Sequence, residues 1–362
     1  MELAVTLNTH GVGTRDDSDW WHQPMAIEEM VPIQSAQLAE RLGFHSVFMG
    51  DHVGLPEQSP DSVSPLHVEG QTNPEVRQRG TSEVDVGGSK RHYPARPNIL
   101  DGAVVMGAVA THTTTLKMGP SVLIAPYRHP LSDARQFATI DTLSQGRLIM
   151  GVGAGWMKEE FDALDRPFDS RLAQLEEAIQ VYKSAWTDDL ATFHGQFYNF
   201  DRIAMDPKPV RKPHPPIVVG VVTKAGARLA ARQANGIDPI LMRPHDDPHG
   251  FDNLQDEIRR EADRVDRDLS DFAMICHVSA LVTDVGHPIT QRDPRPILGG
   301  TPEQVIEDIG RFADAGYSLI VIAPVCPSRT FEEYREQLER LGNDVIPEAK
   351  KIKPAGEWWT GL

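Results

Sequence analysis

The sequence predicts an α/β fold of the TIM-barrel type, with residues 1–362 forming a single (β/α)8 domain. Short apolar runs alternate with amphipathic stretches along most of the chain, which is typical of βα units and a parallel sheet. About eight such runs occur, and helical patterns separate most of them. No linker divides the chain into two complete sets of strands, and α/β barrels often exceed about 250 residues as one domain.

Composition limits the functions that are open to the chain. Its 362 residues include 36 Lys and Arg against 52 Asp and Glu, a net charge of −16, so the surface repels phosphate backbones and anionic lipid. Nucleic acid and membranes are therefore not expected as partners. A hydrophobic content of 40% and a charged content of 24% are ordinary for a globular protein and exclude disorder throughout.

The cysteines and the first residues indicate a compartment. Cys276 and Cys326 are too few for a disulfide framework, which fits a reducing environment. The N-terminus has no basic segment followed by an apolar core, and the longest apolar run, 102–110, is far shorter than the ~20 residues of a membrane span. We therefore expect a cytoplasmic protein.

The first half of the chain contains four predicted βα units. Gly43 suits the C-terminal cap of the first helix, and residues 53–99, which have many Pro, Gly and Ser and no sustained period, are expected to form a long insertion that acts as a lid. The strands are predicted at 3–7, 46–49, 116–124 and 147–152, and the helices at 27–42, 101–110, 131–143 and 171–186.

The second half continues the same rhythm. A small hairpin is predicted at 192–200, a polar insertion at 284–300 and a C-terminal tail at 349–362, while Thr301 and Pro302 are suited to begin a helix. The strands are predicted at 217–221, 237–242, 273–282 and 318–323, and the helices at 224–234, 254–265, from 301 onward, and at 331–345.

In a TIM barrel the functional residues lie at the carboxyl ends of the strands. Candidate strand ends are Asp51 with His52, Ser121 with Val122, 153–156 and 220–223. Histidine is the residue type most often used to donate or accept a proton near neutral pH, so His52 is a candidate for that role. The alternative is an ordinary solvated histidine in a loop.

The run of alternating glycines at 151–155 does not have the G-x-G-x-x-G spacing of a dinucleotide site. These glycines would let a ligand approach the backbone closely, although a tight turn alone would also explain them.

Two further clusters have structural explanations. The His-Asp-Asp-Pro-His stretch at 245–249 is better explained as a solvated loop than as a metal site, so no metal is predicted. Trp20 and Trp21 either line an aromatic pocket or pack under a loop. The sequence contains no serine-hydrolase, zincin or P-loop motif.

Four segments, 41–52, 128–130, 138–156 and 215–220, together resemble the luciferase-like monooxygenase superfamily. The longest of them, from Ala138 to Trp156, is highly specific. The resemblance covers most of the chain except 53–99 and 284–300. It implies a TIM barrel that binds reduced FMN or the deazaflavin coenzyme F-420 and passes electrons to a substrate or to oxygen.

The resemblance also implies roles for individual residues. His52 matches the superfamily's active-site histidine, and Asp51 matches an acidic position beside the ring, where it would orient His52. Ser121-Val122 matches a non-proline cis peptide behind the ring. A phosphate at residues 220–223 would lie at the N-terminus of a helix, which favours an anion. The coenzyme positions implied in this way are Ser121, Val122, Gly153, Ala154, Gly155, Gly220, Val221, Val222 and Thr223.

The substrate pocket is expected at Trp20, Trp21 and Trp156. Sugar-phosphate dehydrogenases of the coenzyme F-420-dependent branch carry a glutamate where this chain has Trp156, which argues against their substrate and favours an apolar pocket. We therefore expect a small organic substrate.

The resemblance supports two chemistries. The leading expectation is hydride transfer between reduced coenzyme F-420 and the substrate, with His52 supplying or removing the proton. The alternative is an FMNH2-dependent two-component monooxygenase that uses oxygen and an external flavin reductase. A third possibility is a flavin-binding protein without catalysis. Because family members are often dimers, a homodimer is also expected.

Overall fold

A computed structural model describes residues 1–9, 25–54, 98–221, 223–239, 248–285, 297–326, 330–356, 358 and 361–362. Among these residues, parallel strands run round a nearly closed barrel in the order β3-β2-β1-β12-β10-β9-β8-β5-β4. Their bounds are β1 Glu2–Thr6, β2 Ser46–Met49, β3 Lys117–Pro120, β4 Leu123–Ile124, β5 Met150–Gly153, β8 Ile217–Val219, β9 Gly236–Ile237, β10 Ala273–Val282 and β12 Leu319–Pro324.

One predicted strand is broken in the structure. The apolar run 116–124 forms β3 and β4, separated by the cis peptide Ser121-Val122. β3 pairs with β2, and β4 pairs with β5. A bridge between Met118 and Leu148 links the first part of the run to the chain just before β5. With β3 and β4 taken together, the strands fit the predicted (β/α)8 order.

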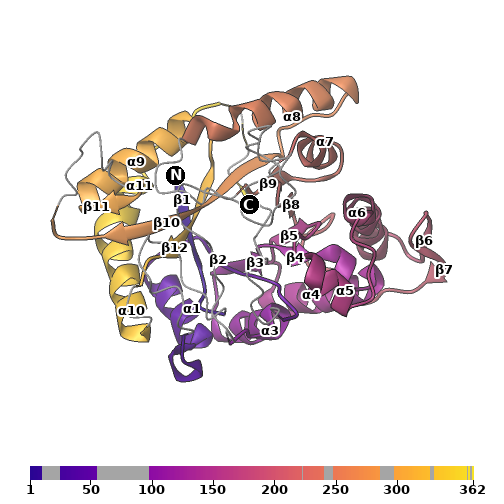
Figure 1. The fold of residues 1–362 in the computed structure, drawn as a ribbon, viewed down its shortest axis with the longest axis horizontal. Helices are drawn as coiled ribbons and strands as arrows, with labels where there is room; N and C mark the ends of the chain where they lie inside the picture. Colours follow the sequence, from indigo (N-terminus) through magenta and orange to yellow (C-terminus); the bar gives the residue numbers. More distant parts are fainter. Residues whose placement is uncertain are drawn as a thin grey trace.

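Helices surround the strands in a ring (Figure 1). The main ones are α1 Pro32–Arg41, α3 Gly102–His112, α4 Pro130–Ser144, α6 Arg171–Thr187, α7 Lys224–Gln233, α8 Asp252–Arg264, α9 Pro302–Asp314 and α10 Phe331–Arg340. Shorter elements are the helices α5 Lys158–Ala163 and α11 Ile346–Ala349, and the strand β11 Gly299–Gly300, which pairs with β10. The predicted hairpin is present as β6 Ala191–His194 and β7 Asn199–Ile203, which lie away from the barrel (Figure 1).

Local sequence explains several helix boundaries. The first helix begins at Pro32, later than predicted, because a 3₁₀ turn at Ile27–Glu29 precedes it and proline suits the first helical turn. Gly43, with φ +80°, follows its end as expected. Thr301 caps α9 in a capping box with Gln304, as the sequence indicated. The last predicted helix, 331–345, forms α10 and a π-helical turn at Leu341–Val345, and α11 follows beyond its predicted end.

Side chains from strands all round the barrel meet in its interior. This cluster contains Ala4, Phe48, Ile149, Val218, Ala273, Ile275, Leu319, Val321 and Leu362. A second, larger core lies between the strands and the helices and includes Leu3, Val5 and Leu7. Since side chains alternate along a strand, Thr6 falls on the same side of β1 as Ala4, toward the interior.

The amino end of the barrel, where helices lead into strands, has short connections and dense polar contacts. The guanidinium of Arg147 donates to the carbonyls of Ala110 at 2.7 Å and Leu116 at 2.6 Å. Leu362 is buried in the barrel interior, and its carbonyl accepts from His45 Nε2 at 3.1 Å. This end of the molecule is therefore a closed, structural surface.

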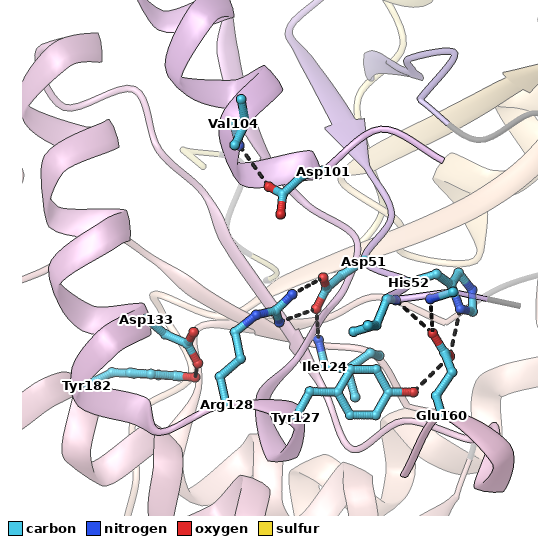
Figure 2. A network of polar contacts seen from close by, with 12 residues as sticks. Asp51, His52, Asp101, Val104, Ile124, Tyr127, Arg128, Asp133, Glu160 and Tyr182 are labelled. Atoms are coloured by element: carbon cyan, nitrogen blue, oxygen red, sulfur yellow. Dashed lines mark hydrogen bonds and ion pairs between the residues drawn. The ribbon is translucent and has the colours of Figure 1, made fainter. Parts of the chain in front are cut away.

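Asp133 is a fully buried carboxylate on the inner side of α4. Tyr182 donates to its Oδ2 at 3.0 Å (Figure 2), while Oδ1 has no hydrogen-bond partner among the described residues. Burial raises the pKa of Asp133 to about 7. In the unfolded chain an aspartate pKa is about 3.9, so between these values the folded state holds the proton that the unfolded state has lost. Stability should therefore fall as pH rises from about 4 to about 7.

Asp133→Asn should remove this dependence. Because the amide side chain of the variant is neutral at all pH values, its free energy of unfolding should rise relative to wild type between pH 5 and pH 8, by on the order of 2 kcal/mol. Urea unfolding at the two pH values measures the change. A variant whose stability tracks wild type across this range would show that Asp133 is ionised when folded.

Several predicted segments lie outside the described residues. They include most of the 53–99 and 284–300 insertions and the stretch 245–247. Among the described residues, no helix combines the length and apolar character that crossing a membrane requires.

Candidate functional site

The predicted site residues gather at the carboxyl ends of the strands. Asp51 and His52 follow β2, and Arg128 and Tyr127 follow β4 (Figure 2). Glu160 lies in α5, just after β5. Residues that are more than a hundred positions apart in the sequence thus form one polar network.

Asp51 is held by Arg128 rather than by His52. The guanidinium of Arg128 makes two parallel hydrogen bonds to the Asp51 carboxylate, at 2.6 and 2.7 Å, and the backbone N–H of Ile124 donates to it at 2.9 Å. The hydrogen bonds with Asp51 raise the pKa of Arg128 above its ordinary value, although burial opposes this. The orienting role predicted for Asp51 therefore does not match its contacts, which instead join the end of β2 to β4.

Glu160 is the carboxylate that orients His52. Its Oε2 accepts from His52 Nδ1 at 2.8 Å and from the hydroxyl of Tyr127 at 2.8 Å (Figure 2). Its Oε1 accepts from the backbone N–H groups of Val53 at 2.8 Å and Gly54 at 3.2 Å. Because the Glu160 carboxylate can only accept hydrogen bonds, the ring nitrogen that faces it must carry a proton. A neutral His52 ring therefore has its proton on Nδ1.

The electrostatics of this pair favour a charged glutamate. The Glu160 side chain is only 2% exposed, and burial alone would raise its pKa. The contacts with His52, Tyr127 and Gly54 outweigh burial and leave the pKa of Glu160 below its ordinary value. Burial and the negative charge of Glu160 together raise the pKa of Tyr127, so the tyrosine stays a hydrogen-bond donor.

Trp156, one of the three predicted pocket residues, lies beside His52. The two rings meet edge to face, with centroids 6.1 Å apart and planes at 82°. Trp20 and Trp21, the other predicted pocket residues, lie outside the described residues. The structure therefore places one apolar wall next to the histidine.

The predicted coenzyme residues converge on Val122. The non-proline cis peptide expected at Ser121-Val122 is present. A Cβ added at Gly153 would lie 2.4 Å from Val122 Cγ2, and one at Gly220 would lie 3.0 Å from Val122 Cγ1. A Cβ at Gly155, where φ is +81°, would lie 2.7 Å from Ile124 Cγ2. Close packing thus explains why these positions are glycine, whether or not a ligand also approaches them.

The remaining predicted positions adjoin this group. Ala154 lies between the two glycines that follow β5, and Val221 is buried after β8. Thr223 caps α7, with its hydroxyl accepting from the N–H of Gly226 at 3.2 Å, so the start of that helix faces the strand ends. Val222 lies outside the described residues.

A second polar group lies under Ser121. The Ser121 hydroxyl donates to Asp238 Oδ2 at 2.7 Å and is 2.8 Å from His277 Nε2. Asp238 follows β9 and is buried, and His277 lies on β10 with its side chain 11% exposed. The ring of His277 meets that of Phe48 edge to face at 6.0 Å.

Sequence reasoning missed Glu160, Asp238 and His277. Nothing in the charged run Lys158-Glu159-Glu160 distinguishes the inward-facing carboxylate. For His277 a signal was available, since His277 and Ser279 place polar side chains at alternate positions of an otherwise apolar strand. The described residues hold no group of three His, Cys, Asp or Glu side chains that could bind a metal ion.

Fold and site together define a TIM-barrel protein with a histidine–carboxylate pair at the carboxyl ends of its strands. The chain belongs to the luciferase-like monooxygenase family, whose model matches residues 85–285, more than half of the sequence. The family resemblance and the barrel fold predicted from the sequence are thereby confirmed.

The names of individual relatives mention two different coenzymes. An FMNH2-dependent dimethylsulfone monooxygenase of Pseudomonas putida is 36% identical over 138 residues, which are 37% of this chain and 38% of that protein. A monooxygenase of Streptomyces bottropensis has a TM-score of 0.68 at 20% identity, covering 96% of this chain and 99% of the other. A coenzyme F-420-dependent tetrahydromethanopterin reductase of Methanopyrus kandleri has a TM-score of 0.66 at 16% identity, covering 97% and 99%. The two structures show a shared fold.

Proposed function

We propose that this protein is an oxidoreductase that uses a reduced flavin or deazaflavin and acts on a small organic substrate. The observation that carries the proposal is the His52–Glu160 pair, joined at 2.8 Å beside Trp156, at the end of the barrel where such enzymes act. Membership of the luciferase-like monooxygenase family supports it.

The residues present fit such a coenzyme. Asp238 has a buried oxygen without a hydrogen-bond partner among the described residues, next to the Ser121-Val122 peptide. The N-terminus of α7, capped by Thr223, is a favourable place for the coenzyme phosphate because helix N-termini attract anions. Gly153 and Gly155 would flank the ribityl chain of the coenzyme, with Ser121 and Val122 behind the ring.

His52 is proposed as the group that donates or accepts the proton. Glu160 holds Nδ1, so the Nε2 side of the ring carries the lone pair when the imidazole is neutral. When the imidazole is protonated, the buried carboxylate stabilises its charge. His52 can thus serve a reaction in either direction, with Glu160 as its positioning residue.

The coenzyme supplies the electrons, as a hydride from a deazaflavin or by reaction of reduced FMN with oxygen. Hydride transfer with coenzyme F-420 is the reading that the sequence pattern favoured. The 36% identity to an FMNH2-dependent monooxygenase favours the reaction of reduced FMN with oxygen, which would require a separate flavin reductase as partner. The homodimer and the cytoplasmic location stay predictions.

Parallel titrations separate the two chemistries. The protein is titrated with FMN and with coenzyme F-420, and turnover of each reduced coenzyme is followed with and without oxygen. Tight binding of F-420 and oxygen-independent turnover would support hydride transfer, whereas oxygen consumption with FMNH2 would support a monooxygenase. Binding of neither coenzyme would contradict the proposed function.

A His52→Ala variant should bind the coenzyme normally and lose turnover by about 10²–10⁴-fold, the usual contribution of a positioned acid or base. Coenzyme binding and substrate-dependent oxidation of the reduced coenzyme are measured on the same preparation. His194→Ala, which alters an exposed histidine of the outer hairpin, is the matched control and should retain full activity. Wild-type turnover by His52→Ala would exclude this role.

A further inference from the structure

Asp238 carries a buried oxygen that the protein itself does not satisfy. Only 1% of the residue is exposed. Its Oδ2 accepts from Ser121 at 2.7 Å and lies 3.3 Å from His277 Nε2, but its Oδ1 has no hydrogen-bond partner among the described residues. A buried acceptor left in this way destabilises the folded state, because it has lost its hydrogen bonds to water without replacing them. Native proteins contain few such atoms.

Two further side chains at the same end of the barrel share this property. Asn8 Nδ2 and Thr6 Oγ1 are also buried without a partner in the described part of the chain. Thr6 lies on β1 on the side of Ala4, which belongs to the interior cluster, and Asn8 lies two residues beyond the end of that strand. At the carboxyl ends of the strands, an acceptor, Asp238 Oδ1, and an amide donor, Asn8 Nδ2, thus both lack a partner among the described residues.

The position of Asp238 connects it to the proposed coenzyme site. Ser121 joins Asp238 to the peptide whose Val122 packs against Gly153 and Gly220. The other two carboxylates of the site are already occupied, since Asp51 accepts three hydrogen bonds and Glu160 accepts four. Asp238 Oδ1 thus lies beside the proposed coenzyme site as a buried carboxylate oxygen without a hydrogen-bond partner among the described residues.

We propose that Asp238 Oδ1 accepts a hydrogen bond from the imide N–H of the pyrimidinedione ring, a group that FMN and coenzyme F-420 share. An imide places a carbonyl oxygen on either side of its N–H, so this edge of the ring combines one donor with two acceptors. Ser121 and His277 act as positioning residues that hold the other carboxylate oxygen. This inference rests on the proposed function and adds a recognition residue to it.

The test compares each coenzyme with its analogue methylated at the imide nitrogen, which lacks the donor. Binding to wild type is followed by fluorescence titration, and we expect methylation to weaken it by about tenfold or more, the effect of leaving a buried acceptor without its hydrogen bond. Asp238→Asn should weaken binding of the natural coenzyme and reduce the preference for it over the methylated one. Asp238→Ala, which makes room, should bind the methylated analogue better than wild type does.

Asp308→Asn is the matched control, because Asp308 is an equally buried carboxylate that accepts from the N–H of Leu298, on a different element. It should keep the wild-type preference. Equal binding of natural and methylated coenzyme by wild type would overturn the role of Asp238 and leave the proposed function standing. If neither natural coenzyme bound to wild type, the proposed function would fail, and this inference with it.

Discussion

Glu160→Gln is expected to lower turnover by about 10²–10³-fold while the protein stays folded and still binds its coenzyme. Glutamine has the same size, but its amide nitrogen is a donor where His52 Nδ1 and the Tyr127 hydroxyl now donate. Facing a donor, the imidazole would move its proton to Nε2, which then lacks the lone pair that a base requires. The variant would also lose the negative charge that stabilises a protonated His52.

Two measurements distinguish this role from a merely structural one. The pH profile of turnover should change in Glu160→Gln, and ¹⁵N NMR of labelled histidine should show the ring proton on Nε2 rather than Nδ1. Tyr127→Phe removes one hydrogen bond but keeps the carboxylate, so its turnover should fall by less than about tenfold. If Glu160→Gln kept the wild-type rate, pH profile and tautomer, Glu160 would not position His52.

Gly151→Ala is expected to destabilise the protein strongly. A Cβ at Gly151 would lie 2.1 Å from the carbonyl oxygen of Pro120, a backbone atom that cannot rotate away. The alanine would force apart β5 and the broken strand next to it, so we expect a loss on the order of 3 kcal/mol or a protein that does not fold. Urea unfolding and the yield of soluble protein measure this.

Gly107→Ala supplies the contrasting control. Gly107 lies within α3, and an added Cβ there would meet nothing within 4 Å. Since alanine favours a helix over glycine, this variant should gain about 0.5–1 kcal/mol. An unfolding midpoint of Gly151→Ala equal to that of wild type would mean that the strands separate without strain.

The sequence predicted the barrel well because each βα unit has a local pattern. β2 and β10 begin and end where predicted, since a short apolar run between polar flanks fixes a buried strand. No local pattern in the apolar run 116–124 marks the break at Ser121-Val122. Only the family resemblance indicated that break. β5 begins at Met150, three residues later than predicted, although the apolar pattern starts earlier.

The site was predicted less completely, because its hydrogen bonds join distant positions. His52 and Glu160 are 108 residues apart, and Ser121 and His277 are 156 apart. No local period reveals which carboxylate will meet which histidine, so the sequence placed the orienting role on Asp51, the nearest acid. In the folded protein Asp51 pairs with Arg128 instead, and the carboxylate that contacts His52 is Glu160.

The short links at the closed amino end of the barrel have a consequence for how this protein can change. There the chain passes from helix to strand within a few residues, as between α1 and β2 or between α9 and β12. The long segments 10–24, 55–97, 240–247 and 286–296 instead follow strands β1, β2, β9 and β10. Insertions and exchanges of sequence can therefore accumulate at the rim that carries the candidate site, while the opposite rim keeps the short connections on which the fold depends.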